Sequence, residues 1–69
     1  MKRTSRQRLL DAGMIVVIKA ARMGDTVRAA HEARRMLQDH PDCGMTELEI
    51  VEFLLRVAIE HRVTVDTRT

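Results

Sequence analysis

The chain has 69 residues, a formal net charge of +2 and a single cysteine, Cys43. This length suits one domain, and a lone cysteine excludes an intramolecular disulfide. Only one residue is aromatic, Phe53, so the core must be built from aliphatic and methionine side chains. Because a chain this short buries a small share of its surface, we expect self-association to supply additional stability.

Charge is divided unevenly along the chain. Residues 1–35 hold nine Lys/Arg and three Asp/Glu, a formal charge of +6, and residues 36–69 hold three and seven, a charge of −4. This asymmetry indicates an acidic partner or front-to-back self-association, although uneven solvated charge arises equally well by chance.

The longest apolar run, residues 14–18, is far shorter than the ~20 residues of a membrane span. The basic start lacks the apolar stretch of a signal peptide, so we expect a cytoplasmic protein with no membrane partner.

The first predicted helix covers residues 5–23 and begins with a capping box formed by Thr4 and Gln7. Ile15 and Ile18 flank its polar side, so it is apolar beyond one stripe. Residues 14–18 could instead form a buried strand, but no obvious partner strand exists. Gly13 marks either a close helix crossing or the true helix start. The apolar face consists of Leu9, Leu10, Gly13, Val16, Val17, Ala20 and Ala21.

The second predicted helix covers residues 26–39, after a turn at Gly24 and Asp25. So short a connection predicts an antiparallel helix pair. Residues 40–44 contain a proline and a glycine and should end the helix. Its narrow apolar arc consists of Ala29, Ala30, Ala33, Met36 and Leu37.

The third predicted helix covers residues 47–61 and is the most apolar segment of the chain. Thr46 and Glu49 form a capping box, and Met45 and Ile50 stand where a hydrophobic staple does. The apolar arc is roughly twice the ~100° that a surface helix needs, so this helix should be buried on more than one side. We therefore predict an interface for self-association that uses Ile15, Ile18, Phe53, Leu54, Leu55 and Ile59.

Residues 63–69 alternate apolar and polar side chains. This pattern is compatible with a short strand or a strap across a partner. Because the segment is short and terminal, an extended, frayed tail is the favoured expectation.

The segment 24–41 resembles the second helix of a tetratricopeptide repeat. Gly24-Asp25, Ala29, Leu37 and Pro41 match the turn glycine, the small packing residue, the core residue and the closing proline of that family. The first helix lacks the family's large aromatic residue and Leu-Gly pair, and no second repeat follows. The resemblance implies an antiparallel helix pair with a third helix packed on it.

The residue types that carry metal or catalytic chemistry are sparse. His40 and Cys43 have a ligand-like spacing, but His31 and His61 form no second pair for a zinc site. Cys43 is expected to be a solvated loop thiol without an activating base. No phosphate-binding glycine loop or hydrolase motif occurs, so we expect no enzyme activity, metal or cofactor.

A basic face is predicted on the second helix, formed by Arg28, His31, Arg34 and Arg35 and adjoined by a basic arm at residues 1–8. Such a face could follow nucleic-acid phosphates. Against this, no aromatic residue is available for base stacking, and the third helix is too apolar to serve as a recognition helix.

The sequence thus predicts one all-α domain over residues 1–69, with three helices, that forms a homo-oligomer and most simply a dimer. The leading hypothesis is a small cytoplasmic protein-interaction or regulatory module that binds itself and an unidentified protein partner. The alternative is a small basic nucleic-acid-binding regulator that uses Arg28, Arg34, Arg35 and the N-terminal arm.

Overall fold

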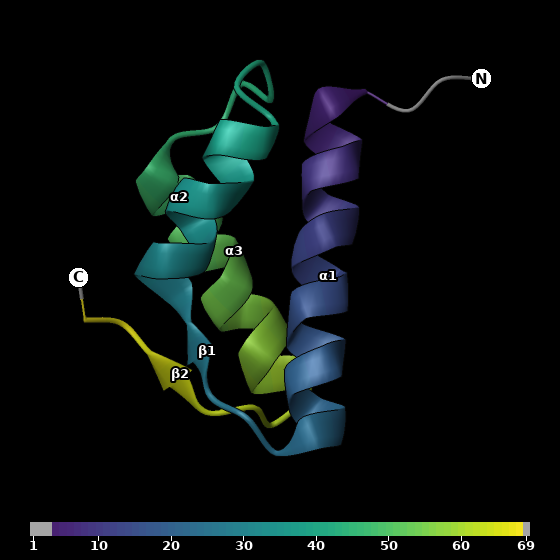
Figure 1. Ribbon diagram of the computed structural model, residues 1–69, viewed down its shortest axis with the longest axis vertical. Coiled ribbons are helices and arrows are strands. Elements are labelled where there is room, and N and C mark those ends of the chain that lie inside the picture. Colours follow the sequence, from purple (N-terminus) through teal and green to yellow (C-terminus); the bar gives the residue numbers. More distant parts are fainter. Residues whose placement is uncertain (1–3, 69) are drawn as a thin grey trace.

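The computed structural model describes residues 4–68 and is mostly helical. Its elements are α1 (Ser5–Met23), β1 (Val27–Arg28), α2 (Ala29–Asp39), α3 (Glu47–Glu60) and β2 (Val65–Asp66). Helix α2 runs back alongside α1, and α3 lies behind both (Figure 1). The prediction of a small all-α domain with three helices is therefore confirmed.

Helix α1 is continuous, so residues 14–18 are helical and do not form a buried strand. At its start, the Gln7 amide donates to Thr4 Oγ1 at 3.2 Å, and the Thr4 amide donates to Gln7 Oε1 at 3.1 Å. At its end, Gly24 adopts a left-handed conformation with φ 68°, and its amide donates to the Ala20 carbonyl. Two local motifs thus set both ends of the helix.

Gly13 is buried in the middle of α1, where side chains of α3 and α2 pack against it. A Cβ atom built on Gly13 would lie 2.6 Å from Phe53 Cε2 and 3.1 Å from Met36 Cε. A contact of 2.6 Å is shorter than packed carbon atoms tolerate. Gly13 therefore marks a close helix crossing, which is one of its two interpretations from the sequence.

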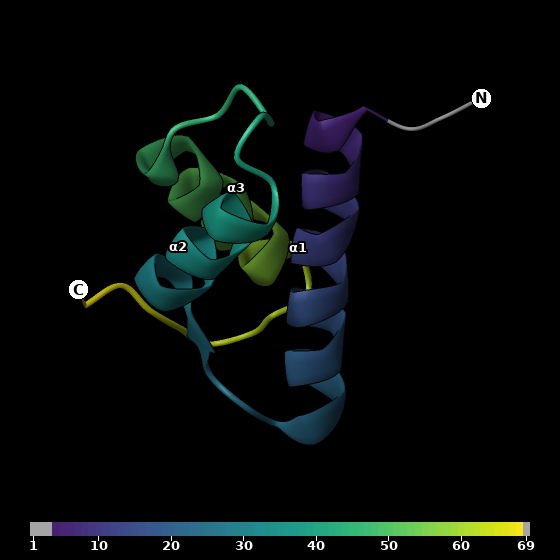
Figure 2. The same ribbon diagram turned by 45° about the horizontal axis from the view of Figure 1, so that its top comes forward.

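The second helix starts later than expected, because residues 27–28 form a strand. Val27 pairs with Val65 and Arg28 with Asp66 in a parallel two-stranded arrangement. The Val27 amide donates to the Thr64 carbonyl at 2.9 Å. The predicted helix start at residue 26 is wrong, and so is the frayed tail for the part of residues 63–69 that the structure describes. Both views show the C-terminal segment lying beside β1 (Figures 1 and 2).

The segment that resembles a tetratricopeptide repeat also contains the strand β1. Here β1 lies between Gly24 and Ala29, the first residue of α2. The antiparallel arrangement of α1 and α2 with a third helix packed on both is present (Figure 1).

Helix α3 supplies much of the core. Ile50 and Leu54 are completely buried, as are Leu9 and Val17 of α1. No polar or charged side chain is buried among residues 4–68. The core is therefore aliphatic, with Met36 and the small alanines of α2 completing it.

Helix α3 begins at a capping box. The Glu49 amide donates to Thr46 Oγ1 at 3.2 Å, and the Thr46 amide donates to Glu49 Oε1 at 3.0 Å. These hydrogen bonds, first from the backbone and then from the side chain of Thr46, hold the pKa of Glu49 below its ordinary value, with a smaller contribution from Arg6. The helix ends at Glu60, one residue before the expected end.

None of the helices within residues 4–68 combines the length and the apolar character that crossing a bilayer requires.

Candidate functional site

Helix α3 carries an exposed apolar stripe made of Leu48, Leu55 and Ile59. Leu48 is 67% exposed and Ile59 is 75% exposed, while Leu55 is half-buried. Spacings of seven and four residues place the three side chains on one side of the helix. Leu48 was not among the residues predicted for an interface, although its spacing from Leu55 would have identified it. Exposed leucine and isoleucine aligned along one helix are the side chains that a second surface most readily covers.

The predicted interface residues are divided between the core and the surface. Leu54 has no exposed surface, so it belongs to the core and its assignment to an interface is wrong. Phe53 is half-buried and packs over Gly13. Leu54 projects toward α1 and α2 because it lies on the same side of α3 as Ile50 and Val57, which are also buried.

The two predicted residues of α1 are both exposed. Ile15 is 64% exposed and Ile18 is 36% exposed. Ile15 lines a groove between α1 and α2, whereas Ile18 lies outside the lining of that groove. Ile15, Ile18 and the stripe of α3 therefore do not line one common groove.

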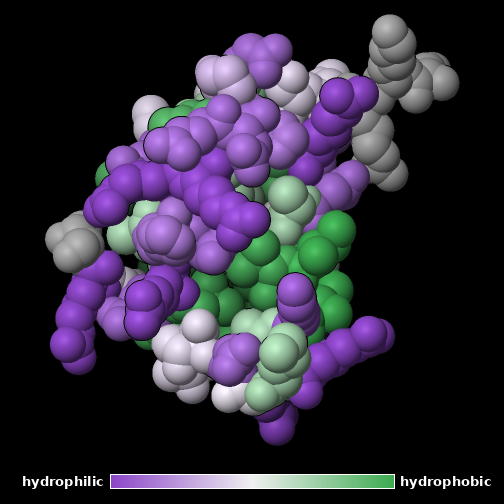
Figure 3. Space-filling model, in the orientation of Figure 1, coloured by the Kyte–Doolittle hydropathy of each residue, from purple (hydrophilic) through white to green (hydrophobic). Residues whose placement is uncertain are grey.

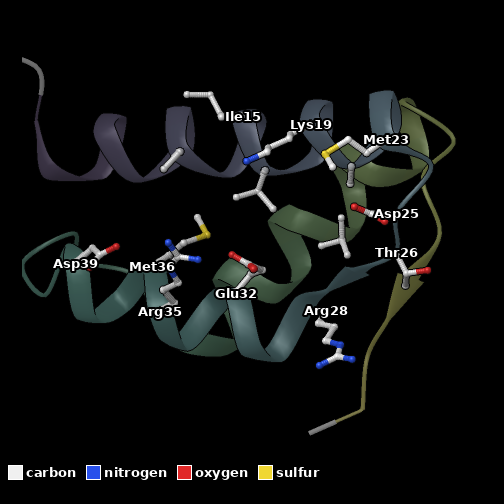
Figure 4. A pocket seen from close by; sticks show the side chains of 14 residues that line it. Ile15, Lys19, Met23, Asp25, Thr26, Arg28, Glu32, Arg35, Met36 and Asp39 are labelled. Atoms are coloured by element: carbon white, nitrogen blue, oxygen red, sulfur yellow. The ribbon is translucent and has the colours of Figure 1, made fainter.

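The groove between α1 and α2 has a volume of about 570 Å³. Ile15, Val16 and Met23 of α1 and Met36 of α2 provide apolar surface, and Figure 3 shows a hydrophobic area there with hydrophilic side chains around it. In Figure 4, α1 forms one wall and α2 the other, with β1 at one end of the groove. Its charged lining residues are of both signs: Lys19, Asp25, Arg28, Glu32, Arg35 and Asp39.

The structure divides the predicted basic face. Arg28, His31 and Arg34 line a second hollow of about 270 Å³ at the start of α2, and Arg28 also borders the groove. Arg35 lines the groove and not the hollow. Two residues of the C-terminal segment, Asp66 and Arg68, complete the second hollow. Neither was predicted, because a terminal tail gives no indication in sequence of the strand with which it pairs.

Two ion pairs modify the charge of this basic surface. Arg34 Nε lies 3.0 Å from Glu47 Oε1, which joins α2 to the start of α3. Arg68 Nε lies 3.8 Å from Asp66 Oδ1, which also accepts the Arg68 amide at 3.0 Å. Both ion pairs are largely exposed, so they add little to the stability of the fold. Their main effect is to position the guanidinium groups.

Of the predicted basic arm, residues 1–3 lie outside the described part of the chain. Residues 5–8 form the first turn of α1, with Arg6 and Arg8 exposed. This end of α1 is far from the start of α2, because the two helices are antiparallel (Figure 1). Arg6 and Arg8 therefore lie apart from the hollow.

Cys43 is buried, in contrast to the solvated thiol expected for this loop. Only 4% of the residue is exposed, and Sγ donates to the Met45 carbonyl at 3.8 Å. The expectation is wrong because the loop folds its thiol onto the core, where cysteine behaves as a small hydrophobe. Within residues 4–68, no three His, Cys, Asp or Glu side chains come together in a group that could hold a metal ion.

Comparison with known proteins gives no match to a family model, a curated protein or a solved structure. The candidate sites are therefore the surfaces described above: the α3 stripe, the groove between α1 and α2, and the basic hollow at the start of α2.

Proposed function

We propose that this chain is a small cytoplasmic interaction or regulatory module that acts by binding other chains and works as a homo-oligomer, most simply a two-fold dimer. The observation that carries the proposal is the exposed stripe of Leu48, Leu55 and Ile59 on α3. A module of this size gains stability by covering such a stripe, because each fully buried large aliphatic side chain contributes about 1.5–3 kcal/mol.

An antiparallel two-fold contact between α3 helices suits the arrangement of this stripe. It places Leu48 of one copy beside Ile59 of the other, and Val51 and Leu55 near the symmetry axis. The same side chains are then covered in both copies, as an isologous interface requires. Glu52 and Arg56 flank the stripe and are exposed, so they can pair across the rim.

Such a dimer leaves the groove between α1 and α2 open in each copy. We assign the groove to a protein partner that presents an amphipathic helix. Its apolar surface, from Ile15, Val16, Met23 and Met36, and its charged lining of both signs suit the apolar and polar faces of such a helix. The cytoplasmic assignment is consistent with a lone cysteine kept as a thiol.

Light scattering over a concentration series tests the dimer. We expect about twice the chain mass of 7.9 kDa at high concentration, and a melting temperature that rises with concentration. A mass of one chain at about 100 μM, with a melt independent of concentration, would contradict the proposal.

Cross-linking in the source cells tests the groove. Ile15→Asp should abolish cross-links to a partner protein, whereas Arg22→Asp, on the same helix outside the groove lining, should retain them. A partner retained equally by both variants would remove the groove from the proposal.

A further inference from the structure

We propose that the hollow at the start of α2 binds a phosphate group, as part of a phosphorylated small molecule or of a nucleic-acid backbone. The hollow is lined by Arg28, His31, Arg34, Asp66 and Arg68, together with Ala30, and has a volume of about 270 Å³. This proposal is independent of the dimer, because none of its residues belongs to the α3 stripe.

Pairing of the two strands brings the arginines together. Arg28 stands opposite Asp66 in the parallel register, and Arg68, two residues beyond Asp66, lines the same hollow. On α2, His31 and Arg34 are three residues apart and therefore neighbours on one helix face. Side chains from β1, α2 and the C-terminal segment thus converge on one hollow.

The charge of the hollow favours an anion. Three arginines against one aspartate leave a formal charge of +2 among the lining residues, without counting His31. Arg34 donates its Nε–H to Glu47. This ion pair does not involve the other N–H groups of the guanidinium. Asp66 lowers the local positive charge, but it also holds the Arg68 backbone in place through its hydrogen bond of 3.0 Å.

The N-terminus of α2 also favours an anion at the hollow. Arg28 is the N-cap residue, and no side chain caps the first amides of the helix. The N-terminus of a helix carries a partial positive charge and unpaired N–H groups, which favour a nearby anion. This contribution is secondary, since the arginines supply the full charges.

Three guanidinium groups from separate elements fit a phosphate better than a carboxylate. A carboxylate has two oxygens in one plane, which a single arginine can satisfy with two parallel hydrogen bonds. A phosphate presents oxygens in several directions and can accept from several donors at once. The convergence at this hollow therefore points to a phosphate as the ligand group.

Fluorescence anisotropy and calorimetry on the full chain provide the test, with inorganic pyrophosphate and a random-sequence DNA duplex as probes at about 50 mM salt. We expect at least one probe to bind. Arg28→Gln and Arg68→Gln should each weaken binding by roughly tenfold, since a charge-assisted hydrogen bond is lost. Arg35→Gln is the matched control, because Arg35 is the neighbour of Arg34 on α2 but does not line the hollow, and it should change binding less than about twofold.

A fourth variant tests the role of Asp66. Asp66→Asn removes its charge while retaining an oxygen that can accept the Arg68 amide, so binding should become tighter by a few-fold. Melting curves of all variants establish that they remain folded, which is expected because the side chains of Arg28, Arg35 and Arg68 are exposed.

The pattern of results separates the sources of the phosphate. Pyrophosphate binding without duplex binding assigns a phosphorylated small molecule, and duplex binding that weakens steeply with salt assigns a nucleic-acid backbone. Binding of neither probe overturns the proposal. Equal losses in Arg28→Gln and Arg35→Gln overturn it as well, because they would show a diffuse positive field without a specific hollow. Neither result bears on the dimer, which is measured by mass.

Discussion

Gly13 and Phe53 are in such close contact that the glycine has no room for a side chain. A Cβ atom at position 13 would lie 2.6 Å from Phe53 Cε2. The single aromatic ring of the chain therefore packs on α1 at Gly13, where α3 crosses close to α1.

Gly13→Ala should destabilise the protein despite the higher helix propensity of alanine. Propensity favours alanine by about 1 kcal/mol, but the overpacked methyl group costs typically 1–3 kcal/mol, so we expect a net loss of about 1 kcal/mol. Chemical denaturation measures the change. In a Phe53→Leu background the same substitution should cost less or become stabilising, because the ring that it would meet is gone. An equal loss in both backgrounds would show that the ring is not the obstacle.

Thr46→Ala should lower the free energy of unfolding by about 1 kcal/mol, because it removes the hydroxyl that accepts the Glu49 amide. Thr46→Ser is the matched control and should retain most of the stability, since serine offers the same acceptor. Thermal or urea unfolding measures both variants. If Thr46→Ala melts like the parent, the capping box contributes nothing to α3.

Glu49 should make stability depend on pH in the acidic range. Its pKa is lowered from 4.5 in the folded state by hydrogen bonds from Thr46, so the unfolded chain takes up its proton first as the pH falls. The contribution is complete above the unfolded pKa and disappears as the pH falls through the folded pKa. Glu49→Gln removes this titration, so its stability relative to the parent should improve on acidification. A difference between the two that stays constant from neutral to acidic pH would exclude the linkage.

Deleting residues 65–69 should destabilise the protein by about 1–2 kcal/mol. Val27 is only 2% exposed and pairs with Val65, so the deletion removes a strand partner and uncovers a buried valine. Urea unfolding measures the loss, and amide exchange at the start of α2 should accelerate. Removing residue 69 alone serves as the control. A truncated chain as stable as the parent would restore the frayed tail as the correct description.

Ile59→Asp should lower the mass of the oligomer to that of one chain and leave the fold intact, since Ile59 is 75% exposed. A buried or closely packed charge at the proposed interface would be unpaired and costly. Ile15→Asp places the same charge at a similarly exposed isoleucine of the groove and should leave the mass unchanged. Light scattering with circular dichroism measures both. If Ile15→Asp dissociates the protein and Ile59→Asp does not, the copies meet at the groove instead of at α3.

Features that depend on neighbours in sequence were predictable for this chain. The capping boxes at Thr4 and Thr46 and the left-handed Gly24 depend on hydrogen bonds between residues a few positions apart, so their residue types alone indicate them. The periodicity of apolar residues then predicted three helices, because one face of each must be removed from water.

Features that depend on distant parts of the chain required the tertiary structure. Nothing local to Val27 or Val65 indicates that they pair, and this pairing moves the start of α2 and carries Arg68 to Arg28. The choice between Leu54 as a core residue and Ile59 as a surface residue likewise follows from where α1 and α2 pack on α3, since both are apolar and lie on one helix. The sequence by itself determined the three helices, both ends of α1 and the start of α3, where short-range hydrogen bonds form the caps. Only the tertiary structure decided which apolar side chains remain exposed and which charges converge, because packing and strand pairing join segments that the sequence separates.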